Sequence, residues 1–272
     1  MATVKATVFG AGGSIGSKLA AHLQGLGWEV LALHRGDDSW LDRDLGHVFY
    51  CVGLTADFRT RPFETIDAHV GMTVEALRRG RFESFLYLSS TRVYAKSDRG
   101  DETAALVVDP SDPSDLYNLS KLMGEAACLA VDNPQVRIAR LSNVFGEGMG
   151  ESNFLMSVLS EAIRTGAVEL RQGLASAKDY IAIEDVLEAL VCVSVAGRER
   201  LYNLAAGRNT SHAQILDAVQ ALTGRRTSVA PDSPTVAFPP ISVDRLAELG
   251  VRANRDVIAA LPQVLRSLMS RT

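Results

Sequence analysis

Seven residues near the start of the chain, Gly10-Ala-Gly-Gly-Ser-Ile-Gly16, constrain its fold more than any other segment. An apolar β-type run over residues 3–9 precedes them, and a run over 15–26 with apolar residues at helical spacing follows. A sharp strand-to-helix turn needs glycine, and the free N–H groups at the start of the helix can bind a pyrophosphate. The segment therefore predicts a dinucleotide-binding turn, although glycine clusters also occur in ordinary strand-to-helix turns.

The first half of the chain alternates β-type and helix-type runs. Further strands are predicted at 29–33, 48–52, 85–89 and 136–141, and helices near 63–79 and 117–131. This order predicts an α/β fold of the Rossmann type, a doubly wound parallel sheet with helices on both faces. Beyond about residue 146 the pattern loosens, apart from helices over 186–196 and near 256–269, which predicts a smaller C-terminal substrate lobe.

The composition is that of a globular protein, with 47% hydrophobic and 22% charged residues among 272. A chain of this length can bury two unequal cores. We expect an NAD(P)-binding domain over 1–146, a lobe that binds mainly substrate over 147–272, and segments at about 178–207 that return to the first domain.

Charge and cysteine usage indicate a small-molecule ligand. The net charge of −4 and the pI near 5.8 disfavour nucleic acid and anionic membranes as partners. The three cysteines lack the spacing of a metal site or a disulfide framework, so we expect no metal and a cytoplasmic location. We expect no export signal, because the first residues lack a long apolar core, and no apolar stretch reaches the roughly 20 residues that span a bilayer.

The end of the second predicted strand suggests which dinucleotide binds. An acidic residue there would hydrogen-bond the adenosine ribose, whereas an arginine would pair with a 2′-phosphate. His34 and Arg35 occupy this position, which favours NADP. Asp37 and Asp38 follow closely and keep NAD as the alternative.

A Y-x-x-x-K motif occurs once, at Tyr117-Asn-Leu-Ser-Lys121. Positions i and i+4 share one helix face, so the ammonium of Lys121 would lower the pKa of the Tyr117 phenol. Tyr117 would then donate or accept a proton near neutrality. Without further support, the pair would be a surface tyrosine and lysine on one helix.

A hydroxyl that orients the reacting oxygen is expected at the end of a strand that faces the cofactor. The predicted strand over 85–89 ends in Ser89-Ser90-Thr91-Arg92. Ser90 fits this role, although a serine here also fits a helix cap.

These motifs together resemble the extended short-chain dehydrogenase/reductase group, in its branch of NAD(P)-dependent nucleotide-sugar epimerases and dehydratases. The G-x-x-G-x-x-G spacing is similar, and Ser89 to Tyr94 resembles the S-S-x-x-V-Y-G run of that group, with Ala95 in place of the glycine. The similarity continues through Arg140-Leu-Ser-Asn143-Val-Phe-Gly146, Asp179-Tyr-Ile-Ala-Ile-Glu-Asp185-Val and Tyr202-Asn-Leu-Ala-Ala-Gly207. The resemblance thus covers almost the whole chain.

The resemblance implies an enzyme with Ser90, Tyr117 and Lys121 as catalytic residues. It implies a cofactor site formed by Gly10, Gly12, Gly13, Ser14, Ile15, Gly16, His34, Arg35, Cys51, Val52, Gly53, Ser89, Tyr117, Lys121, Leu141, Asn143 and Val144. It implies a substrate site formed by Thr55, Ser90, Thr91, Arg92, Asn143 and Lys178. By analogy with the group, the helices over 63–79 and 117–131 would form a homodimer through residues such as Leu119, Met123 and Ala127.

Differences from the sequence pattern of the group reduce the number of reactions that we expect. Thr91-Arg92 stands where the 4,6-dehydratases carry an Asp-Glu pair, which argues against dehydration. Lys178 replaces an arginine and keeps its charge without the bidentate fork. Only about fourteen residues separate the second strand from Val48, so one strand and its helix are expected to be missing. Arg59 and Arg61 follow the next strand end and either contact phosphate or are solvated charges.

The sequence therefore predicts an NADP-dependent reductase of a nucleotide-linked keto-sugar as the leading hypothesis. An epimerase that retains NAD would use the same three residues, and sequence barely separates the two. A dinucleotide-binding sensor without catalysis is a third reading, against which the combination of Ser90, Tyr117 and Lys121 argues.

Overall fold

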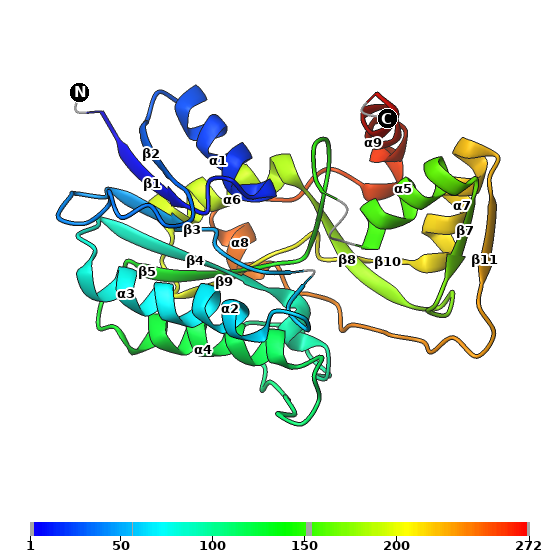
Figure 1. Ribbon diagram of the computed structural model, residues 1–272, viewed down its shortest axis with the longest axis horizontal. Helices are drawn as coiled ribbons and strands as arrows, with labels where there is room; N and C mark the ends of the chain where they lie inside the picture. The colour runs from blue at the N-terminus through cyan, green and yellow to red at the C-terminus, as the bar shows by residue number, and fades with distance from the viewer. Residues whose placement is uncertain (1–2, 56, 151–153, 271–272) are drawn as a thin grey trace.

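A parallel sheet and the helices that cover it form the larger part of the molecule (Figure 1). The structure, a computed structural model, describes residues 3–55, 57–150 and 154–270. Within these residues the sheet has six strands in the spatial order β2-β1-β3-β4-β5-β9. Their bounds are β1 Lys5–Phe9, β2 Glu29–Leu33, β3 His47–Tyr50, β4 Ser84–Ser90, β5 Val136–Leu141 and β9 Leu201–Leu204.

Helices cover both faces of this sheet, which confirms the predicted doubly wound α/β fold. One face carries α1 (Ser14–Gly25) and α6 (Ile183–Ala196), whose buried residues share a core with the upper side of the strands. The other face carries α2 (Pro62–Ile66), the π-helical turn η1 (Asp67–Gly71), α3 (Met72–Arg79) and α4 (Leu116–Ala130) (Figure 1). The central strands β4 and β5 are buried along nearly their whole length, as strands covered on both faces must be.

The C-terminal part contains more regular structure than the loosened pattern beyond residue 146 predicted. In the part that the structure describes, a three-stranded sheet has the order β10-β8-β6, and β11 pairs with β7. The strand bounds are β6 Asn143–Phe145, β7 Ala167–Leu170, β8 Ala177–Ala182, β10 Asn209–Ser211 and β11 Arg226–Val229. The helices are α5 Phe154–Thr165, α7 His212–Thr223, α8 Asp244–Glu248 and α9 Val257–Met269. Strands this short carry too few alternations to be recognised from sequence.

The chain returns to the large sheet after building part of this lobe. Strand β8 belongs to the three-stranded sheet, where it lies between β6 and β10. After it, α6 packs on the large sheet and β9 is a strand of that sheet. The proline-rich segment 231–240 runs from β11 back along β8, where Ala237 bridges Ala177. The division of the chain at residues 146 and 147 stays a prediction.

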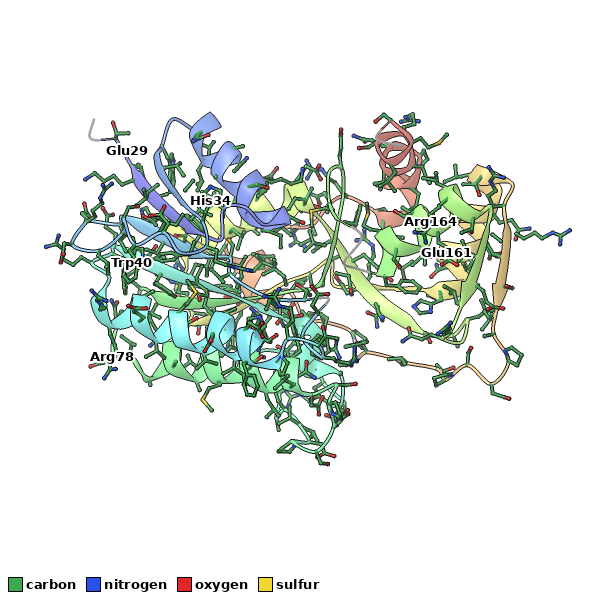
Figure 2. All side chains as sticks on the ribbon, viewed as in Figure 1. Glu29, His34, Trp40, Arg78, Glu161 and Arg164 are labelled. Atoms are coloured by element: carbon green, nitrogen blue, oxygen red, sulfur yellow. The ribbon has the colours of Figure 1, made fainter. Side chains whose placement is uncertain are left out.

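The connection from β2 to β3 holds neither a strand nor a helix, as its length predicted. In the usual order of a dinucleotide-binding sheet, another strand would lie outside β2. Here β2 is the edge. Trp40 from this connection is 6% exposed and packs edge-on against Phe9, with 5.4 Å between ring centroids (Figure 2).

Candidate active site

The glycine turn has the geometry that a pyrophosphate site requires. Gly10 lies at a φ of +79°, and the N–H groups of Gly10 and Ala11 both donate to the carbonyl of Leu33. A Cβ on Gly16 would lie 2.3 Å from the Gly10 carbonyl oxygen, so Gly16 lets α1 approach β1 closely. The first turn of α1 holds no acidic residue, and its N-cap Gly13 provides no side-chain cap. The N–H groups of this turn can therefore bind an anion.

A groove of about 760 Å³ continues from this turn, and we call it the glycine groove. Its lining includes eight of the predicted cofactor residues, namely Gly10, Gly12, Gly13, His34, Arg35, Cys51, Val52 and Gly53. Predicted residues Ser14, Ile15 and Gly16 form the start of α1 beside it. His34, marked in Figure 2, lies against Gly12, with its Nδ1 3.2 Å from the position of an added Cβ. These residues fit a dinucleotide.

The adenosine end of the groove contains both kinds of charge. Arg35 and Arg61 line the groove together with Asp37 and Glu64, and Arg61 forms an ion pair with Glu64 at 3.4 Å. The cations suit a 2′-phosphate, and the carboxylate of Asp37 suits a free ribose. Hydrogen bonds from the side chain and from the backbone N–H of Ser39 lower the pKa of the Asp37 carboxyl group.

Three residues predicted to be catalytic meet at the carboxyl end of β4. Tyr117 lies in the first turn of α4 and is 6% exposed. Lys121 lies one turn later, and its Nζ donates to the carbonyl of Leu88 at 2.9 Å. Ser90 ends β4, and its Oγ accepts the N–H of Arg92 at 3.2 Å, so it caps the short 3-10 helix η2 (Thr91–Tyr94). Ser90 and Tyr117 line one cavity.

The pKa values of this group differ from the expectation that Lys121 lowers the pKa of Tyr117. Burial lowers the pKa of Lys121 to about 7. Burial raises the pKa of Tyr117, while the Ser90 side chain and the charge of Arg92 oppose this rise. In the protein without a ligand, the positive charge that lowers the pKa of Tyr117 therefore comes from Arg92, whereas the sequence predicted that it would come from Lys121.

His69 is a buried neighbour of Tyr117 that sequence reasoning missed. Its Nε2 accepts the N–H of Leu54 at 3.3 Å, so its Nδ1 carries the proton and donates to Ser120 Oγ at 2.8 Å. Ser120 in turn donates to the carbonyl of Tyr117. Burial lowers the pKa of His69 to about 2, which keeps the ring neutral. His69 thus joins the loop after β3 to the helix turn of Tyr117, and no local sequence pattern marks it.

The cavity at Ser90 and Tyr117, here called the catalytic cavity, has a volume of about 410 Å³. It also contains the predicted substrate residues Thr55, Thr91, Arg92, Asn143 and Lys178. Asn143 donates to the carbonyl of Asp179 at 2.8 Å and so joins β6 to β8. Lining residues that were not predicted include Phe154, Gln172 and Phe238, which come from segments that only the tertiary fold brings together.

Some predicted cofactor residues have other contacts. The hydroxyl of Ser89 donates to Glu125 Oε1 at 2.5 Å and so points into a buried network. Leu141 and Val144 are part of the hydrophobic core. Among the residues that the structure describes, no group of three or more His, Cys, Asp or Glu side chains could hold a metal ion. Nor is any helix in this part of the chain long and apolar enough to cross a membrane.

Comparisons with known proteins agree with this geometry. The model of the NAD dependent epimerase/dehydratase family matches residues 6–205. The dTDP-4-dehydro-6-deoxyglucose reductase of Escherichia coli is 25% identical over 161 residues, which are 56% of this chain and 49% of that protein. The match therefore spans about half the length of this curated relative.

Solved structures share the fold over nearly the whole chain. MoeE5 in complex with UDP-glucose and NAD is 21% identical, with a TM-score of 0.77, and the match covers 98% of this chain and 99% of MoeE5. The same protein has been solved with UDP-glucuronic acid and NAD. RMD from Pseudomonas aeruginosa, complexed with NADPH, is 22% identical with a TM-score of 0.77, over 99% of this chain and 100% of RMD.

Proposed function

Because the chain belongs to the NAD dependent epimerase/dehydratase family, we propose that it is an NADP-dependent reductase of a keto-sugar linked to a nucleotide. One observation carries this proposal. The loop after β3 lines the glycine groove with residues 51–54 and the catalytic cavity with Thr55, so the two sites meet beside Ser90 and Tyr117. A dinucleotide and a sugar can therefore meet at a proton-transferring hydroxyl.

Each catalytic residue has a task that follows from its position. A reduced dinucleotide held in the glycine groove would supply a hydride to the carbonyl carbon of the sugar, and a proton from the protein completes the CH–OH group. Tyr117 gives the proton from its hydroxyl to the carbonyl oxygen, and Ser90 orients that oxygen by a hydrogen bond. Lys121, buried below the loop after β3, is placed to bind the ribose hydroxyls. Its protonation would then lower the pKa of Tyr117.

NADP is the proposed dinucleotide because Arg35, which follows the end of β2, lines the glycine groove and can pair with a 2′-phosphate. The second candidate is an epimerase with retained NAD, which Asp37 in the same groove favours. Purified protein that carries NAD and interconverts nucleotide sugars without added cofactor would contradict the reductase. UDP-glucose, UDP-glucuronic acid and their keto derivatives are suitable first ligands.

A homodimer in the cytoplasm is the proposed state of the enzyme. Neighbouring helices α2, α3 and α4 expose Phe63 (77%), Ile66 (40%), Met72 (37%), Met123 (58%) and Leu129 (46%). These helices lie side by side on the outer face of the large sheet (Figure 1). Exposed apolar side chains on adjacent helices suit a helix-to-helix contact between two copies.

Replacement of the catalytic hydroxyl tests the proposal. Tyr117→Phe should lower kcat about 100- to 10,000-fold, because it removes the proton donor, and should change dinucleotide affinity far less. Steady-state kinetics and calorimetric titration with NADPH measure the two effects. Tyr180→Phe is the matched control, since the hydroxyl of Tyr180 is buried without a hydrogen-bond partner among the described residues. Unchanged turnover in Tyr117→Phe would instead support a non-catalytic dinucleotide-binding protein.

A further inference from the structure

Positive charge gathers around the catalytic cavity. Among the described residues that line it, Arg59, Arg92 and Lys178 are cationic, and Asp179 is the one acid. The carboxylate of Asp179 accepts backbone N–H groups at residues 206 and 208, at 2.9 and 3.0 Å. It is therefore engaged away from the cations, and the cavity favours an anionic ligand.

Arg92 lies close to the reacting group. Its Cζ lies 5.5 Å from the ring centroid of Tyr117 and 5.1 Å from that of Phe58. One of its five N–H donors bonds the carbonyl of Ser114, at 3.2 Å from Nη2. The aromatic rings and this bond hold the guanidinium in place and leave further donors for a ligand.

Arg92 lacks the carboxylate partner that a half-buried arginine usually has. Within the described part of the chain it forms no ion pair, whereas buried Arg140 binds both oxygens of Glu125. Burial, together with the charge of Arg59, lowers the pKa of Arg92, although Tyr117 and the carboxylates of Asp115 and Asp112 partly oppose this shift. Burial and the charge of Arg92 likewise lower the pKa of Lys178. An anion among these groups would relieve both the repulsion and the cost of burial.

We propose that the reacting sugar itself carries a carboxylate, and that Arg92 binds it through two parallel N–H donors. This inference rests on the proposed function. Because Arg92 lies beside Tyr117, its partner must be a substituent close to the carbon that changes oxidation state. Lys178, whose Nζ lies 5.1 Å from the Phe154 ring centroid, is left to bind the diphosphate of the nucleotide.

UDP-glucuronic acid and UDP-glucose test the inference, because they differ only at C6, which is a carboxylate in the first and a hydroxymethyl group in the second. Calorimetric titration in the presence of NADP should show that the wild-type protein binds the carboxylated sugar about 10- to 100-fold more tightly. Arg92→Gln should remove this preference and keep the affinity for UDP-glucose, which also shows that the variant is folded. Arg92→Lys should restore part of the preference. Lys178→Gln, the matched control, should weaken both ligands by the same factor.

The outcomes separate the two proposals. If the wild-type protein binds neither sugar nucleotide, the proposed function fails and the inference fails with it. If the wild-type protein binds both equally, it does not recognise the carboxylate, and the inference alone is overturned. The inference alone is also overturned if Arg92→Gln weakens both equally, because Arg92 then binds the diphosphate that the two ligands share.

Discussion

Lys121 has an unusual environment for a lysine. It is 4% exposed, its amine donates to one carbonyl, and it forms no ion pair within the described residues. The fold therefore holds a cation where burial disfavours charge, which costs free energy of folding until a ligand replaces the lost hydration. Placement of a reactive amine in a buried site at the expense of stability is common in enzymes.

The buried amine of Lys121 makes stability depend on pH. Since its folded pKa of about 7 is below the ordinary lysine pKa of 10.5, the unfolded state binds more protons between these values, and stability rises with pH there. From pH 7 to pH 9 the free energy of unfolding should rise by about 2 kcal/mol more in wild type than in Lys121→Met. Urea unfolding of the ligand-free proteins at both pH values measures this difference. Equal pH dependence in the two proteins would show that Lys121 has an ordinary pKa.

The sequence predicted those site residues whose relation is local. Tyr117 and Lys121 share one helix, so their spacing alone places them together. His69 could not be found in this way, because its two ring contacts reach 15 and 51 residues along the chain. The effect of Arg92 on Tyr117 was missed for the same reason, since it depends on how η2 packs against α4.

At the scale of elements, a buried polar network fixes α4 against the large sheet. Glu125 of α4 accepts from Ser89 of β4 and from Arg140 of β5. Arg140 also donates to Tyr94, whose hydroxyl donates to Asn203 of β9. Because Tyr117 and Lys121 lie on the same helix, this network also sets their height above the sheet.

Glu125→Gln should therefore lower the free energy of unfolding by about 3 kcal/mol, because it leaves Arg140 buried without its counter-charge. Glu75→Gln is the control, since Glu75 pairs with Arg79 on the exposed side of α3 and should change stability by less than about 1 kcal/mol. Chemical denaturation of both variants gives the comparison. Similar values for the two would mean that the network contributes no more than a surface pair.

Substitution of two glycines of α1 distinguishes the effect of close packing from the effect of helix propensity on stability. Gly16→Ala should destabilise by about 1–3 kcal/mol and abolish NADP binding, because the added Cβ would collide with the Gly10 carbonyl. Gly25→Ala should stabilise by up to about 1 kcal/mol and leave binding unchanged, because nothing lies within 4 Å of its Cβ. Thermal unfolding with and without NADP measures both. Normal NADP binding by Gly16→Ala would contradict the proposed pyrophosphate site.

Most elements of the large sheet were predictable, whereas in the C-terminal lobe the sequence predicted α9 (Val257–Met269) but not the short strands. Five strands and the four main helices around them follow long periodic runs, and they agree with the predicted ranges to within a few residues. The lobe depends on short strands such as Asn143–Phe145 and Asn209–Ser211, which form only because a distant partner lies beside them. Tertiary contacts, and not local pattern, determine such strands.

At the scale of the whole molecule, assembly can be tested on the exposed helices. Met123→Glu should convert the proposed dimer to a monomer, because it places charge in the centre of the apolar face of α4. Leu222→Glu is the control, since Leu222 is 45% exposed on α7 in the other lobe. Sedimentation velocity at micromolar concentration distinguishes the two states. A monomeric wild-type protein would contradict the proposal.

The missing strand beside β2 also has a consequence for backbone dynamics. The N–H of Glu29 donates to Val4 at 2.9 Å, and successive residues of a strand direct their N–H groups to opposite sides. The amides of Leu31 and Leu33 thus face β1, while those of Val30 and Ala32 face the open edge. In deuterated water we expect slow hydrogen exchange at the first pair and fast exchange at the second. This alternation of slow and fast exchange would be absent if a partner chain or a bound adenosine covered the edge.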